Sequence, residues 1–234
     1  PLESSHMTAP RTFAMSQWTR TLACLVLSSA VSLPALAQDA PAGDPAAGAK
    51  KAAMCIGCHG IVGYQSSFPE IYKVPKISGQ SSVYLASALK AYRKGDRKHP
   101  TMRGIAMSLS DTDIADLAAY YQSHTTAAAA SSAPPAPTPA VQALLTKGNC
   151  LACHGENLNK PIDPSYPKLA GQHADYLYAS LKAYQTTGNP HVGRANAIMQ
   201  GQVQAFTHAE LKQLADHAAR LPGTLETVPQ SRFR

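Results

Sequence analysis

Two pentapeptides of the same form decide the fold: Cys55-Ile56-Gly57-Cys58-His59 and Cys150-Leu151-Ala152-Cys153-His154. Two such cysteine pairs are also compatible with disulfides, with a redox-active Cys-x-x-Cys or with a four-cysteine zinc site. The histidine that directly follows each pair separates these possibilities, because C-x-x-C-H is the signature of c-type haem attachment. The pattern therefore predicts two covalently bound haem c groups. The residues expected to form the thioether bonds are Cys55, Cys58, Cys150 and Cys153.

The similarity of the two halves extends beyond the cysteines. Residues 75–80 read PKISGQ and residues 167–172 read PKLAGQ, and Tyr-Leu and Leu-Lys-Ala-Tyr segments follow both at the same offset of 92 residues. Further on, Met102-Arg103-Gly104 matches Met199-Gln200-Gly201. The chain is therefore predicted to contain two homologous domains in tandem.

Composition shifts mark the ends of these domains. Arg20 precedes an apolar run over residues 22–36 that ends in an A-x-A motif, which is typical of a secretory signal peptide. We expect residues 1–37 to be upstream residues and signal, cleaved after Ala37, and the mature protein to be exported to the periplasm. Residues 44–124 are predicted to form the first domain and residues 139–234 the second. An alanine-, serine- and proline-rich linker, residues 125–138, would join them.

Both domains are predicted to be all-α. The first would begin with a helix over residues 46–54 after Asp44-Pro45, and the second with one over residues 140–147 after Thr138-Pro139. Central helices are predicted over residues 82–94 and 174–186. The last helices would start at Ser110 and Thr207, which resemble capping boxes. We interpret the apolar stripes of these helices as the core that buries a flat apolar cofactor.

The histidine of each motif is the predicted proximal ligand of the iron, namely His59 and His154. For the sixth ligand we predict Met102 and Met199, because the repeat places both methionines before a glycine. Thioether plus imidazole ligation raises the reduction potential and leaves no open coordination position. Such closed sites favour reversible one-electron transfer over activation of oxygen or peroxide.

The remaining methionines and histidines are weaker candidates. Met54 adjoins the attachment motif and Met107 has no counterpart in the second half. Of the other histidines, His99 and His191 lie shortly upstream of the methionines and are the only two that we consider as replacement ligands.

Taken together, the mature chain resembles the dihaem cytochromes c4, which are tandem class I c-type cytochromes. The resemblance rests on the paired C-x-x-C-H motifs, the P-K-[IL]-x-G-Q segments and the M-x-G segments. It implies that the carbonyl groups of Pro75 and Pro167 orient the proximal histidines, and that electrons pass along a respiratory chain to a terminal oxidase. One departure is that Tyr120-Tyr121 correspond to His217-Ala218, so the second domain is expected to pack its terminal helices less tightly.

The formal net charge of +7 is compatible with an acidic protein partner or an anionic membrane surface. No long basic run with interleaved aromatic residues is present, which disfavours nucleic acid. Five basic residues crowd the segment around Met102: Arg93, Lys94, Arg97, Lys98 and Arg103. Two interpretations are open: a solvated loop in which one or two of these residues pair with haem propionates, or a positive face presented to an acidic redox partner. We therefore expect an electron carrier and not an enzyme, with redox proteins such as membrane respiratory complexes as partners and peripheral membrane association possible. Two alternatives are the haem subunit of a dehydrogenase complex and a dihaem peroxidase.

Overall fold

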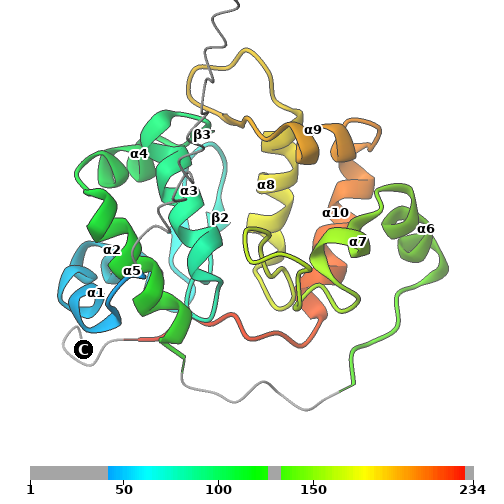
Figure 1. Cartoon of the computed structure of the whole chain (residues 1–234). Helices are drawn as coiled ribbons and strands as arrows, with labels where there is room; N and C mark the ends of the chain where they lie inside the picture. The colour runs from blue at the N-terminus through cyan, green and yellow to red at the C-terminus, as the bar shows by residue number, and fades with distance from the viewer. Residues whose placement is uncertain (1–41, 126–132, 230–234) are drawn as a thin grey trace, which may run out of the picture. The chain divides into compact units, whose positions relative to one another are not determined.

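A computed structural model of the chain describes residues 42–125 and 133–229. The predicted signal peptide, its cleavage after Ala37 and the central part of the predicted linker lie outside the described residues. In what is described, two helical groups follow one another along the chain (Figure 1), and the all-α prediction is confirmed, with only four strands of two residues each in these ranges.

The first group contains five helices whose starts are fixed by local sequence. Asp44 caps the first helix by accepting a hydrogen bond from the backbone N–H of Ala46, and Ser110 forms a full capping box at the last. The central helix begins after the cap Ser81, as predicted. The helices are α1 (Pro45–Lys51), α2 (Ala53–His59), α3 (Ser82–Lys94), α4 (Pro100–Met107) and α5 (Asp111–Ser123).

A glycine lets α1 cross α5 at close range. A Cβ atom at Gly48 would lie 2.1 Å from the backbone oxygen of Asp116, so no larger residue fits there without a shift of backbone. Lys51, one turn further along α1, forms ion pairs of 2.7 Å with Asp113 and 2.6 Å with Asp116. The crossing therefore combines backbone contact with charge pairing.

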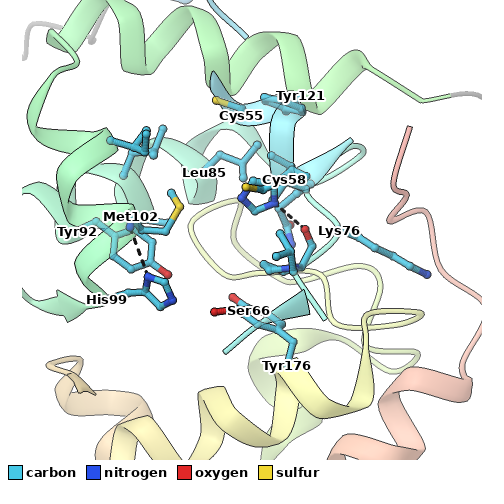
Figure 2. Close-up of a pocket in the computed structure, with 18 of the residues that line it drawn as sticks. Cys55, Cys58, Ser66, Lys76, Leu85, Tyr92, His99, Met102, Tyr121 and Tyr176 are labelled. Atoms are coloured by element: carbon cyan, nitrogen blue, oxygen red, sulfur yellow. Dashed lines mark hydrogen bonds between the residues drawn. The ribbon is translucent and has the colours of Figure 1, made fainter. Parts of the chain in front are cut away.

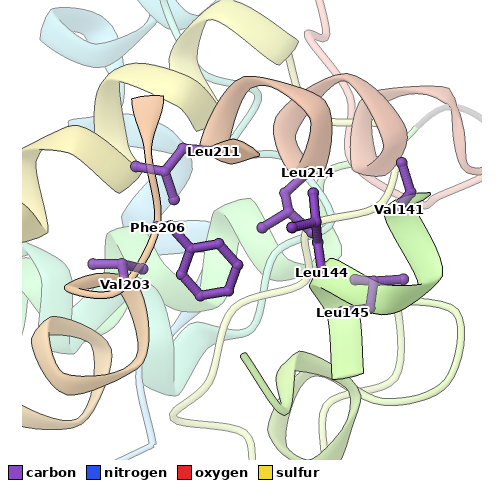
Figure 3. Close-up of a cluster of buried hydrophobic side chains, with 7 residues drawn as sticks. All are labelled: Val141, Leu144, Leu145, Val203, Phe206, Leu211 and Leu214. Atoms are coloured by element: carbon purple, nitrogen blue, oxygen red, sulfur yellow. The ribbon is translucent and has the colours of Figure 1, made fainter. Parts of the chain in front are cut away.

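The second group repeats this order with different packing. Thr138 caps its first helix and Thr207 forms the capping box of its last. Its largest core cluster is apolar and joins the first helix to the last (Figure 3); the members are Val141, Leu144, Leu145, Val203, Phe206, Leu211 and Leu214. The helices are α6 (Pro139–Lys147), α7 (Cys150–His154), α8 (Ala174–Gln185), α9 (Ala197–Val203) and α10 (His208–Arg220).

The short strands connect segments that are distant in sequence. Strand β1 (Gln65–Ser66) pairs with β2 (Tyr72–Lys73) inside the first domain. Strand β3 (Arg97–Lys98) pairs antiparallel with β4 (Gly193–Arg194), so this pair joins the two domains. The described residues of both domains accordingly belong to one compact unit.

The chain returns to its first domain after the last helix. Glu226 donates a backbone hydrogen bond of 3.0 Å to the carbonyl of Ser78, and the two residues form an isolated β-bridge. In the described ranges, no helix has both the length and the apolar character needed to cross a membrane.

Candidate functional site

A cavity of about 380 Å³ lies inside the first domain, within the range typical of small-molecule and cofactor sites. Cys55 and Cys58 line it from α2 and Met102 from α4, while aromatic residues of α3 and α5 complete its wall. Figure 2 shows Met102 and Cys58 facing the cavity from different sides. The wall also includes Gln172 and other residues of the second domain. The predicted attachment and ligand residues of the first half thus converge on one cavity that opens at the domain interface, whereas those of the second half do not line it.

The two predicted proximal histidines share the same kind of hydrogen-bond partner, a proline carbonyl. Nδ1 of His59 lies 2.8 Å from the carbonyl oxygen of Pro75, and Nδ1 of His154 lies 2.9 Å from that of Pro167. A carbonyl only accepts, so Nδ1 carries the proton and Nε2 keeps its lone pair. Burial lowers the pKa of both histidines, although the carbonyl hydrogen bonds act in the opposite direction. Each ring is therefore held as a neutral imidazole, which is the form that binds iron.

The two predicted methionines each sit in the first turn of a short helix that sequence analysis had not delimited. The N–H of Met102 donates to the ring of His99, which caps α4, and the N–H of Met199 donates to Asn196, which caps α9. Met102 lines the cavity, and Met199 is partly buried against the apolar cluster of the second domain. By contrast, Met107 has 61% of its surface exposed.

The two histidines considered as replacement ligands are not equivalent. His99 contributes to the cavity wall, but its Nδ1 is used in capping α4. Asn196 occupies the same place before Met199 as His99 does before Met102, and it caps α9 in the same way. His191 lies in an exposed loop between α8 and β4. The repeated geometry therefore gives His99 the role of a helix cap.

Two arginines lie opposite each other on the paired strands: Arg97 is buried and lines the cavity, and Arg194 is half-buried beside a small neighbouring hollow. Arg97 on β3 donates to the hydroxyl groups of Tyr84 and Tyr176, each at 3.2 Å, and its guanidinium lies 4.7 Å from the ring centre of Tyr92. Arg194 on β4 donates to the same Tyr176 hydroxyl at 3.2 Å. None of the ion pairs found among the described residues involves either arginine. Burial favours the neutral phenol of Tyr176, yet the charges of Arg194 and Arg97 lower its pKa below the usual value.

This cluster corrects the predicted basic docking surface. Arg97 has only 9% of its surface exposed and points into the domain interface, so it cannot contact a partner. Lys98 donates to the carbonyl of Asn189 in the second domain and Arg93 is paired with Asp111, whereas Lys94 stays exposed beside Asp96. The sequence contains a sign of the internal position of Arg97. The offset of 97 residues that relates the two methionines also relates Arg97 to Arg194. A basic residue repeated in both halves indicates a shared internal role.

Comparison with known proteins places this arrangement in a class. Residues 45–125 and residues 140–220 each match the family model for cytochrome c. The chain is 31% identical over 192 residues to cytochrome c4 of Azotobacter vinelandii, covering 75% of this chain and 88% of that protein. The crystal structure of reduced recombinant cytochrome c4 from Pseudomonas stutzeri matches with a TM-score of 0.56 and 29% identity, covering 77% of this chain and 100% of that one. The chain therefore belongs to the dihaem cytochrome c4 family.

A further relative is the thiosulfate dehydrogenase electron acceptor of Thiomonas intermedia. It is 30% identical over 184 residues, covering 73% of this chain and 81% of that protein. The family shares tandem haem domains that transfer electrons, and this chain is a dihaem electron-transfer cytochrome with two covalently bound haem c groups.

The residues present fit that cofactor. The four cysteines of the two motifs are unbridged and lie at the starts or interiors of the short helices α2 and α7. The apolar wall of the cavity suits a porphyrin plane. Arg97 is buried beside this cavity with its Nε unpaired and, among the described residues, in no ion pair, which suits a carboxylate group of a haem.

Proposed function

We propose that this protein is a periplasmic carrier that passes single electrons within a respiratory chain toward a terminal oxidase, with each haem iron held between a histidine and a methionine. The ligand pairs would be His59 with Met102 and His154 with Met199. One observation carries this proposal: His59 and Met102 line the same cavity, and the Nδ1 side of His59 is already engaged by Pro75. Nε2 is thus the nitrogen left for iron.

The other residues divide the work of holding the cofactor. Cys55 and Cys58 would form thioether bonds in the first domain, as would Cys150 and Cys153 in the second. Arg97 and Arg194 would bind haem carboxylates through their guanidinium groups. Bound haem supplies one-electron redox chemistry, and the chain sets the potential at which it occurs.

A closed pair of axial ligands has a direct functional consequence. If His59 and Met102 hold one iron, and His154 and Met199 the other, the bound haems would supply one-electron chemistry and no coordination position would be left for a substrate. The apolar residues around the cavity would reduce the contact of bound haem with water, which favours the less charged reduced site. These features support electron transfer and disfavour peroxidase activity.

The test uses the intact holoprotein. We expect spectra of the oxidised protein to show the methionine–iron charge-transfer band at two haems per chain, and the reduced protein to bind carbon monoxide slowly or not at all. Rapid binding of carbon monoxide or peroxide at either haem would contradict closed His–Met ligation and favour the peroxidase alternative.

A second candidate function is supported by the Thiomonas intermedia relative, whose name describes an electron acceptor of thiosulfate dehydrogenase. In that function the protein would collect electrons from a dehydrogenase with which it associates. Two rates distinguish the candidates: reduction of the oxidised protein by thiosulfate plus its dehydrogenase, and oxidation of the reduced protein by membranes containing a terminal oxidase. Fast reduction without detectable oxidation by the membranes would favour the dehydrogenase partner.

A further inference from the structure

The two P-K-x-x-G-Q segments exchange their glutamine side chains across the domain interface. Gln172 accepts a hydrogen bond of 3.0 Å from the backbone N–H of Lys76 and donates one of 2.8 Å to its carbonyl. Gln80 does the same for Lys168, at 3.0 Å in each direction. Both glutamines have 4% of their surface exposed. Each domain therefore places one buried amide on the backbone of the other.

The orientation of both amide groups follows from a further hydrogen bond. Oε1 of Gln172 also accepts from the backbone N–H of His173, and Oε1 of Gln80 from that of Ser81, each at 3.0 Å. An amide turned by 180° would direct its NH₂ group at two N–H donors. The oxygen of each glutamine is thus the atom that faces the partner's N–H.

The peptide groups that receive these glutamines also hold the proximal histidines. The C=O of the Pro75–Lys76 peptide accepts from His59, while the N–H of the same peptide donates to Gln172. The C=O of the Pro167–Lys168 peptide accepts from His154, and its N–H donates to Gln80. One planar amide therefore separates each histidine from a side chain of the opposite domain.

Peptide resonance transmits an effect through such an amide. An acceptor on its N–H increases the negative charge on its C=O, and buried hydrogen bonds in series strengthen one another by roughly 10–30% per bond. A more negative carbonyl polarises the Nδ1–H bond of the histidine further. The histidine then becomes a stronger electron donor through Nε2, which stabilises the oxidised iron.

We propose that Gln172 and Gln80 are positioning residues for the axial histidine of the opposite domain, so that the reduction potential of each haem depends on a side chain contributed by the other half. Gln172 acts on His59, and Gln80 acts on His154. The inference rests on the proposed ligation of iron by these histidines. It assigns to the interface a task beyond holding the domains together, because loss of one glutamine changes the potential of the remote haem.

The same interface offers a matched control. Nζ of Lys76 donates to the carbonyl of Gly171, and Nζ of Lys168 donates to that of Gly79, both at 2.7 Å. These hydrogen bonds cross the interface beside the glutamines but do not involve the peptide groups bound to the histidines. The variants K76M and K168M therefore weaken domain contact and leave the two backbone N–H donors in place.

The experiment compares the holoprotein with its variants Q172L, Q80L, K76M and K168M. The potentials of both haems are measured by spectroelectrochemistry, and each step is assigned to a domain through the ¹⁵N-labelled ring signals of His59 and His154. We expect Q172L to raise the potential of the first haem by a threefold change in its oxidised-to-reduced ratio, about 28 mV for one electron. Q80L should raise that of the second.

A second readout reports the hydrogen bond itself. In the reduced protein, the Nδ1–H proton of His59 should shift upfield in Q172L and stay in place in Q80L, whereas that of His154 should do the reverse. K76M and K168M should leave both protons in place. Because each variant removes a cation that lines the cavity, it should lower a potential, which is the opposite sign to the rise expected for the glutamine variants.

Three results would overturn the inference: no change in either potential, a change confined to the haem of the mutated domain, or an equal rise of potential in the lysine variants. The last would show that loosening the interface suffices. Failure of the proposed ligation is seen separately, because it would appear in the spectrum of the parent protein, before any glutamine is changed.

Discussion

The two domains share an attachment motif but hold their first and last helices together differently. In the first domain, α1 crosses α5 at Gly48, with Lys51 bound to the carboxylates of Asp113 and Asp116. In the second, α6 contains no glycine and packs on α10 through apolar side chains such as Leu144. From the replacement of Tyr120-Tyr121 by His217-Ala218, looser packing is expected in the second domain. There, α6 and α10 meet through side chains, whereas α1 and α5 of the first domain meet at their backbones. Domains with the same haem motif can therefore join their first and last helices by either kind of contact.

The largest effect is expected from removing one axial methionine at a time. M102A should lower the potential of the first haem by at least a hundredfold change in the oxidised-to-reduced ratio, about 120 mV, because thioether ligation favours reduced iron. M199A should do the same at the second haem only. Spectroelectrochemistry with carbon monoxide binding measures both. If M107A had the effect expected of M102A, the ligand assignment would be wrong.

Substitution at the backbone crossing should affect stability next most strongly. G48A places a Cβ against α5 and should destabilise the first domain by about 3 kcal/mol, the upper end of the usual cost of overpacking. G104A is the control, since a Cβ there meets nothing within 4 Å, and it should be neutral or stabilise α4 by up to about 1 kcal/mol. Thermal unfolding of the holoprotein gives both values. Equal melting temperatures for the two variants would contradict the close crossing.

The ion pairs of the two domains should differ in how much stability they contribute and in how that contribution changes with pH. Hydrogen bonds from Lys51 lower the pKa of Asp113 and Asp116 below the ordinary 3.8, so the stability they contribute is present above that value and is lost as pH falls further. K51M should therefore lower the melting temperature at neutral pH, and the difference from the parent should shrink in acid.

The matching change in the second domain is K147M. The pKa of Glu210 is lowered mainly by the backbone N–H of Thr207 and only secondarily by Lys147, so most of its stabilisation remains. We expect a smaller loss at neutral pH for K147M than for K51M in melting curves recorded from about pH 3 to 7. A larger loss of melting temperature for K147M than for K51M would contradict this prediction. It would show that the contact between α6 and α10 depends more on charge than the contact between α1 and α5.

The smallest effect concerns partner docking. With Arg97 buried, the exposed cations near Met102 are Lys94 and Arg103. K94Q/R103Q should slow reduction by an acidic redox partner about threefold at low ionic strength, and the difference should vanish at high salt. The control K160Q/K212Q removes the same charge from the second domain. Equal reduction rates for the two double variants would show that the partner does not dock preferentially on the first domain.

Features that depend on neighbouring residues could be predicted from the sequence, whereas features that depend on contacts between distant residues could not. Local signals were sufficient for the haem motifs, for the capping boxes at Ser110 and Thr207, and for α3, whose bounds match the prediction. The short helices α4 and α9 were missed because their caps, His99 and Asn196, precede segments too short to show an apolar period. Arg97 was misassigned because its burial depends on the pairing of β3 with β4, a contact between residues almost a hundred positions apart. The glutamine exchange was hidden for the same reason.

The return of the chain to its first domain has a consequence for biosynthesis. A polypeptide leaves the ribosome N-terminus first, and early domains usually fold before later ones are made. Here the carbonyl of Ser78 accepts a hydrogen bond from the N–H of Glu226, which is synthesised almost 150 residues later. The first half of the protein can therefore reach its final structure only after nearly the whole chain has been translated.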